Sequence, residues 1–151
     1  MAITVDVSPL TSAGKYLTVP ELPSVFVCSL PVKGTLSPGS IATKQGFYLT
    51  AFSRRCTHLG CNILPDTAIG QAIDLPSPDY VVTCPCHFSA FDLVNRALTV
   101  QGPATDFLPR VALRGIDDPL TQVELISWIR DESVPYGVPF EGTSGQPLEK
   151  P

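Results

Sequence analysis

The sequence predicts an all-β fold made of short strands. Sixteen prolines and eleven glycines interrupt a chain of 151 residues, and no stretch carries a long, uninterrupted apolar repeat of helical period. Both observations favour short strands joined by turns over helices. The length is that of one domain of ordinary size, which is enough to bury a real core.

Segments rich in β-branched and aromatic residues, bounded by proline, glycine or polar turns, mark the expected strands. Cys28 lies within one of them and is expected as a small buried hydrophobe rather than a redox thiol. Trp128 lies in the last strand and is expected in the core rather than as an electron relay. Residues 92–97 are expected to form a hairpin turn between strands. The expected strands are residues 2–7, 15–19, 25–30, 40–43, 46–53, 80–83, 108–114 and 120–129.

Charge and hydropathy exclude several classes of protein. The net charge of −4 argues against a nucleic-acid-binding surface. No run of eighteen apolar residues is present, so no membrane span is expected in this chain. Residues 1–6 show neither a basic segment nor an apolar one, so no secretory signal is expected. Residues 131–151 are polar and rich in proline and glycine, which predicts an extended tail that either wraps a partner or is disordered.

The rare soft metal ligands gather in two short segments. Both histidines and four of the five cysteines lie there. The first segment offers Cys56 and His58, and the second offers Cys84 and His87. Two thiolates and two imidazoles suit either tetrahedral zinc or a 2Fe–2S cluster with two Cys on one iron and two His on the other. The donor set by itself leaves both metal centres open.

The segments Cys-Thr-His-Leu-Gly-Cys, from Cys56, and Cys-Pro-Cys-His-Phe-Ser, from Cys84, resemble the paired cluster-binding loops of Rieske iron–sulfur proteins. The resemblance is strong over about residues 47–114. It implies an antiparallel β-sandwich with a cluster-binding subdomain formed by two ligand loops. It also implies a Rieske-type 2Fe–2S cluster. The ligands that it implies are Cys56, His58, Cys84 and His87.

The resemblance also assigns residues around the cluster. It implies a disulfide between Cys61 and Cys86, and a hydrogen bond from Ser89 to a bridging sulfide. Phe91 stands where the family often has a tyrosine that donates to a ligand cysteine. Because donors to sulfur raise the reduction potential, the loss of this one predicts an intermediate value. The remaining residues expected near the cluster are Leu59, Phe88, Gly102 and Pro103, of which Leu59, Phe88 and Pro103 are expected to form an apolar docking rim.

The same resemblance predicts how the chain is divided into a domain and a tail. It predicts a Rieske domain at residues 1–130, with a cluster-binding part at about 47–104, followed by the tail at 131–151. The segment between the two ligand loops is longer than the common family spacing, so residues 62–79 are interpreted as an insertion. This insertion is either part of a docking surface or a neutral surface loop.

The function that the resemblance implies is one-electron transfer. The second loop is similar to the small Rieske subunit of arsenite oxidase, and the first loop to the quinol-oxidising cytochrome complexes. The chain is therefore expected to be a soluble or docked subunit of a respiratory or photosynthetic-type, or arsenite-oxidase-like, redox complex. Expected partners are a catalytic subunit, a cytochrome or a copper protein, with quinol as a further option. Since no second catalytic constellation is visible, it is expected to serve an oxidoreductase rather than to catalyse alone.

Two alternative functions stay open at this stage. One is a Rieske ferredoxin that supplies an oxygenase, although ferredoxins of that kind usually lack the two extra cysteines. The other is a zinc-stabilised interaction module.

Two further questions also stay open. A disulfide fits an oxidising compartment such as the periplasm or a lumen, whereas the missing signal points to the cytoplasm. Arg54 and Arg55, directly before the first loop, are expected to contact a partner, to raise the cluster potential, or to lie solvated at the strand end.

Overall fold

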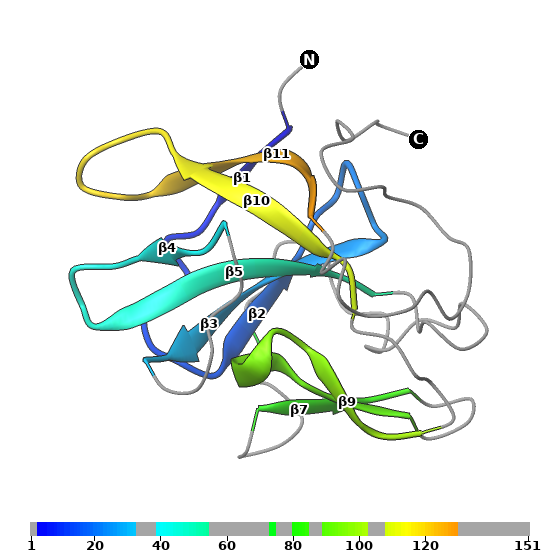
Figure 1. Ribbon diagram of the computed structural model, residues 1–151. Helices are drawn as coiled ribbons and strands as arrows, with labels where there is room; N and C mark the ends of the chain where they lie inside the picture. The colour runs from blue at the N-terminus through cyan, green and yellow to red at the C-terminus, as the bar shows by residue number, and fades with distance from the viewer. Residues whose placement is uncertain are drawn as a thin grey trace.

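The computed structural model of the chain describes residues 3–32, 39–54, 73–74, 80–84, 89–102 and 108–129. In this described part the chain folds into two antiparallel β-sheets and one short 3-10 helix. Figure 1 shows the larger sheet above and the smaller one, in green, below it. No helix among the described residues is long and apolar enough to cross a membrane.

The larger sheet contains the central strands of the fold. Its strand order is β1-β11-β10-β5-β3-β2-β6, and β4 pairs with β5. β1 pairs with β11, placing Ile3 opposite Leu125, so the first and last described strands are neighbours. The strands of this sheet are β1 (Ile3–Asp6), β2 (Lys15–Thr18), β3 (Val25–Pro31), β4 (Ile41–Ala42), β5 (Phe47–Ser53), β6 (Ile73–Asp74), β10 (Arg110–Gly115) and β11 (Gln122–Ile129).

The smaller sheet is a meander of three strands, β7 (Val81–Thr83), β8 (Ala90–Asp92) and β9 (Leu98–Gln101). The 3-10 helix η1 (Leu93–Asn95) joins β8 to β9. Its first residue follows Asp92, whose side chain accepts a hydrogen bond from the Val94 N–H at 3.2 Å. This cap fixes the turn that the sequence predicted at residues 92–97.

The central strand β3 is buried on both faces. Side chains alternate across a strand, so neighbours along β3 enter different environments. Val25 and Val27 pack into one core, whereas Phe26 and Cys28 pack into another. A strand covered on both sides has a nearly continuous apolar sequence, and residues 25–28 and 30 of β3 follow this pattern.

The two cores occupy opposite faces of β3 and β5. The first, which we call the outer core, contains Leu49 and Ala51 of β5 together with residues of β1, β10 and β11. The second, which we call the inter-sheet core, joins the larger sheet to the smaller one. Its members are Tyr16, Phe26, Cys28, Leu30, Phe52, Val82, Cys84, Phe91, Leu93, Val94, Ala97 and Leu108.

The all-β prediction is confirmed, and the structure differs from the expected strands in a few places. Every expected strand is present within one to two residues of its predicted bounds. Cys28 and Trp128 are buried as expected. The prediction gave no bounds for β8 and β9, which flank the turn expected at residues 92–97. It missed β6, which lies inside the expected insertion and pairs with β2. Two residues carry too little periodicity to be recognised, so only pairing with β2 defines this strand. The expected tail at residues 131–151 lies outside the described residues.

Candidate metal centre

Cys84 is the predicted ligand that the structure describes in detail. It directly follows β7, its side chain is fully buried, and it forms no disulfide. Its backbone N–H donates to the Ser89 carbonyl oxygen at 2.7 Å. This hydrogen bond closes the loop between β7 and β8 at its base, so the second predicted ligand loop starts and ends at one fixed point.

Phe91 lies on the same face of the small sheet as Cys84. Val82 and Phe91 are opposite each other in the β7–β8 register, and Cys84 is two positions along from Val82, on the same face. All three side chains enter the inter-sheet core. Diagonal neighbours across an antiparallel pair are within reach of an aromatic side chain. Phe91 therefore stands where a ring substituent can approach the Cys84 sulfur.

The end of β5, which leads into the first predicted ligand loop, is held by backbone hydrogen bonds from two sides. The Ser53 N–H donates to the Pro109 carbonyl at 2.8 Å, and the Arg54 N–H donates to the Ser24 carbonyl at 2.6 Å. The Arg54 guanidinium adds a bond from Nη1 to the Pro23 carbonyl at 3.2 Å. The chain is thus fixed in place two residues before Cys56.

The segment that the sequence predicts as the covering loop also starts from fixed positions. It follows β9, with Gly102 exposed at the strand end. It returns at Leu108, which is fully buried and whose N–H donates to the Ala97 carbonyl at 3.3 Å. Three predicted loops are therefore attached to the ends of β5, β7 and β9.

The described residues test the predicted site in part. The structure brings together Cys84, Ser89 and Phe91, all fully buried. Within the described ranges no three potential metal-binding side chains gather; three of the four predicted ligands lie outside those ranges. A buried cysteine without a disulfide, at the base of a closed loop, fits a thiolate ligand to iron. The predicted residues outside the described part are Cys56, His58, Leu59, Cys61, Cys86, His87, Phe88 and Pro103.

Two buried arginines are the main feature that sequence reasoning did not anticipate. Arg54 was expected to contact a partner, to raise the potential or to be solvated, and the structure rules out the solvated state because it is only 5% exposed. Arg110 was not singled out, yet it is 2% exposed and the largest of the fully buried side chains. A charged residue in a strand normally faces water, so the sequence carries no signal for either burial.

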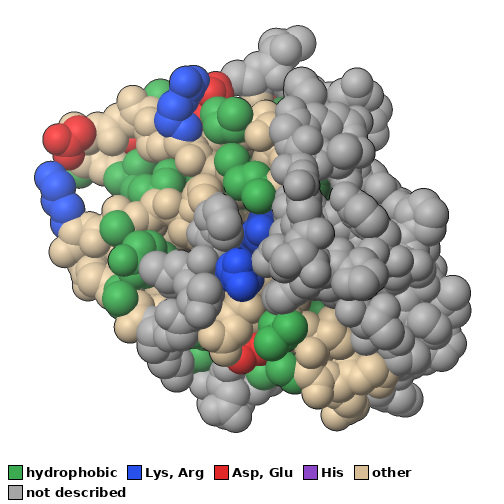
Figure 2. All heavy atoms as spheres, viewed as in Figure 1, with side chains coloured by type: hydrophobic (Ala, Val, Ile, Leu, Met, Phe, Trp, Pro, Cys, Tyr) green, Lys and Arg blue, Asp and Glu red, His purple; other side chains and the backbone are tan. Residues whose placement is uncertain are grey.

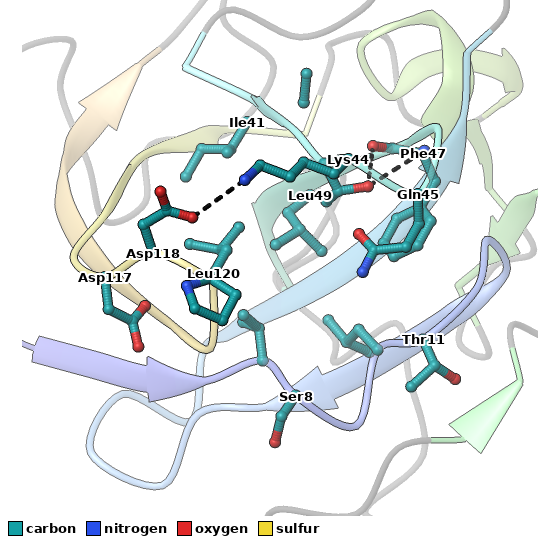
Figure 3. A pocket seen from close by; sticks show the side chains of 15 residues that line it. Ser8, Thr11, Ile41, Lys44, Gln45, Phe47, Leu49, Asp117, Asp118 and Leu120 are labelled. Carbon is teal, nitrogen blue, oxygen red and sulfur yellow. Dashed lines mark hydrogen bonds and ion pairs between the residues drawn. The ribbon is translucent and has the colours of Figure 1, made fainter.

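A cavity of about 430 Å³ lies elsewhere in the molecule. Its wall includes Phe47 and Leu49, at the start of β5, and Leu120. At its rim Lys44 pairs with Asp118 at 3.2 Å, as Figure 3 shows. The first predicted ligand loop follows the other end of β5. The cavity is therefore separate from the predicted metal centre.

Comparison with known proteins decides the family. A model of the Rieske 2Fe-2S domain matches residues 36–112, just over half of the chain. The chain belongs to the Rieske 2Fe-2S domain family. The expected Rieske-type 2Fe–2S cluster, and one-electron transfer through it, are thereby confirmed, whereas the individual ligands stay predictions.

Two relatives and one solved structure illustrate the match to this Rieske domain. The cytochrome bc1 complex Rieske iron-sulfur subunit of Streptomyces lividans is 35% identical over 89 residues, covering 55% of this chain and 46% of that protein. The subunit of the same name from Streptomyces coelicolor is 35% identical over 89 residues, and the match covers 22% of that protein's length. The chain thus spans less than half the length of these curated relatives.

The structural comparison supports the Rieske fold over nearly the whole chain. The soluble domain of the Rieske protein II from Sulfolobus acidocaldarius matches with a TM-score of 0.56 and 21% sequence identity. The match covers 98% of this chain and 84% of that one. At this identity the likeness concerns the fold, and it agrees with the antiparallel sandwich that the sequence predicted.

Proposed function

We propose that this Rieske domain works as an electron-transfer subunit within a larger redox complex. It takes single electrons from a catalytic subunit or a quinol and passes them to a cytochrome or a copper protein. The observation that carries the proposal is Cys84, fully buried and without a disulfide at the base of the β7–β8 loop. The relatives named as subunits of the cytochrome bc1 complex support a role inside a complex.

The proposed cluster ligands are Cys56, His58, Cys84 and His87. Bound by two thiolates on one iron and two imidazoles on the other, a Rieske cluster exchanges one electron at a higher potential than all-cysteine plant-type clusters. The protein contributes fixed strand ends on which both loops start. Because β5 and β7 end in hydrogen-bonded positions, the ligands need move little between redox states, which favours electron transfer over bond-making chemistry.

The surroundings of the cluster follow from the same proposal. A disulfide between Cys61 and Cys86 would join the two ligand loops and fits an oxidising compartment. Leu59, Phe88 and Pro103 would form the apolar rim against which a partner docks. In this division residues 1–130 form the Rieske domain, with residues 131–151 left to contact a neighbouring subunit.

An EPR titration of the purified protein at controlled potentials tests the function. A rhombic reduced-cluster signal that appears at positive potential is expected of an electron carrier in a quinol- or arsenite-type chain. The same signal only at clearly negative potential would favour a ferredoxin that supplies an oxygenase. A colourless protein that contains zinc and no iron would overturn the proposal.

The variant His87→Ala tests the ligand assignment. Removing one of four protein ligands leaves an iron incompletely coordinated, so we expect the visible absorbance and the EPR signal of the cluster to be lost. Circular dichroism should still report strands, because the variant leaves unchanged every core residue that the structure describes. Gln45→Ala, in the turn between β4 and β5, is the control and should keep full absorbance. A His87→Ala protein with an unchanged spectrum would refute the assignment.

A further inference from the structure

Two arginines flank the inter-sheet core on the side from which the ligand loops leave. Arg110 lies directly opposite Phe52 in the β5–β10 register. Residues that are opposite each other in an antiparallel pair project from the same face. Since Phe52 packs in the inter-sheet core with Cys84, Arg110 projects from β10 on the side of the predicted metal centre.

Arg54 occupies the other flank of Phe52. It is two residues further along the chain, in the bend that directly follows β5. Its guanidinium donates to the Pro23 carbonyl at 3.2 Å. It also counteracts part of the rise that burial causes in the pKa of Tyr16, a residue of the inter-sheet core. The charge of Arg54 therefore acts within this core rather than in solvent.

Burial is what makes these two charges effective. An arginine stays protonated in proteins, and a charge removed from water interacts far more strongly than one at the surface. Arg54 is 5% exposed and Arg110 2%. By contrast, the side chains of Lys44 and Arg114 are 85% and 69% exposed. Figure 2 likewise shows basic and acidic side chains side by side at the margin of the visible face.

We propose that Arg54 and Arg110 are potential-setting residues, whose buried positive charges stabilise the reduced form of the cluster and raise its midpoint potential. The proposal rests on the proposed function and deepens it. A positive charge favours the redox state with one more electron, by an amount that depends on distance and on the local dielectric. Arg54 is close by covalent linkage alone, because two residues of chain span at most about 7 Å. These positive charges would offset part of the decrease in midpoint potential that is expected from phenylalanine, which has no hydroxyl donor, at position 91.

The test measures the midpoint potential of Arg54→Gln and Arg110→Gln by EPR-monitored titration. Glutamine keeps a side-chain N–H donor but removes the charge. We expect each change to shift the ratio of reduced to oxidised cluster about tenfold toward the oxidised form, which is about 59 mV for a one-electron couple. The shift should change little between low and high salt, because buried charges are poorly screened.

Arg114→Gln is the matched control. Arg114 lies on β10, as Arg110 does, but its side chain is 69% exposed and pairs with Glu124. Its removal changes the net charge equally and should leave the potential unchanged. Arg54→Lys and Arg110→Lys retain the charge and should stay near the wild-type potential.

The outcomes separate this inference from the proposed function. Intact clusters with wild-type potential in both glutamine variants would overturn the inference while leaving the function standing. If a glutamine variant does not fold, the lysine variant decides, and a potential well below wild type there would refute a charge effect. A purified wild-type protein without any Rieske signal would instead defeat the proposed function.

Discussion

At the scale of single residues, the site depends on what surrounds the Cys84 sulfur. Cys84 and Phe91 share one face of the β7–β8 pair and one core. The ring of Phe91 is fully buried, so any polar group placed on it must find a partner inside that core. This position therefore links packing directly to the electronic properties of the cluster.

Phe91→Tyr is expected to raise the midpoint potential. The added hydroxyl can donate to the ligand sulfur, and a hydrogen bond contributes about 1 kcal/mol, or roughly 40 mV for a one-electron couple. Potentiometric titration measures the change. Phe47→Tyr is the control. Phe47 lies at the start of β5, whereas the first predicted ligand loop follows the end of that strand, so this change should leave the midpoint potential unaltered. An unchanged or lower potential in Phe91→Tyr would mean that this ring does not reach the sulfur.

Cys28 makes a residue-scale prediction about pH. Burial raises the pKa of its thiol above the ordinary 9.0, so the folded chain keeps a proton that the unfolded chain releases above pH 9. The contribution of the protonated Cys28 thiol to the free energy of unfolding is fully present below pH 9. It decreases as the pH rises above 9, by up to about 1.4 kcal/mol per pH unit. The free energy of unfolding of wild type should therefore fall more steeply above pH 9 than that of Cys28→Ala. Parallel curves from denaturant titrations would contradict this.

At the scale of elements, the β7–β8–η1–β9 segment positions one ligand loop and one flank of the covering loop. Its turn is held by Asp92, which accepts from the Val94 N–H at 3.2 Å and from the Asn95 side chain at 2.6 Å. Leu93 and Val94 of η1 pack into the inter-sheet core. The cap and the packing together fix how the small sheet lies against the larger one.

Asp92→Ala should destabilise the protein by about 1 kcal/mol, the usual cost of losing such a cap. Thermal or denaturant unfolding measures this. Asp118→Ala is the control. It also removes a carboxylate, but the exposed ion pair of Asp118 with Lys44 is expected to contribute little to stability. Equal losses in the two variants would show that the Asp92 cap has no special role.

At the scale of the whole molecule, the two cores on opposite faces of β3 and β5 have different structural roles. The outer core holds the larger sheet together. The inter-sheet core attaches the smaller sheet and contains Cys84. Loss of packing in either core lowers stability, but among the residues that the structure describes only the inter-sheet core contains a predicted ligand, Cys84.

Leu108→Ala and Leu49→Ala compare the two cores with the same substitution. Leu108 belongs to the inter-sheet core and Leu49 to the outer core, at 0% and 1% exposure. Each should cost about 2–5 kcal/mol of unfolding free energy. We expect only Leu108→Ala to accelerate loss of the cluster absorbance under conditions where the protein stays folded. Equal rates of cluster loss would argue against the division between cores.

The sequence by itself determined the fold class, the expected strands and the family. Those features follow from local signals: proline and glycine spacing, apolar alternation, and two ligand segments that resemble the cluster-binding loops of one family. The pairing of β6 with β2 was not predictable, since two residues form a strand only when a partner strand is beside them. The burial of Arg54 and Arg110 was likewise decided by tertiary structure. Nothing in a charged residue's own neighbourhood indicates burial, because it results from strands and turns that are distant in the chain closing over it.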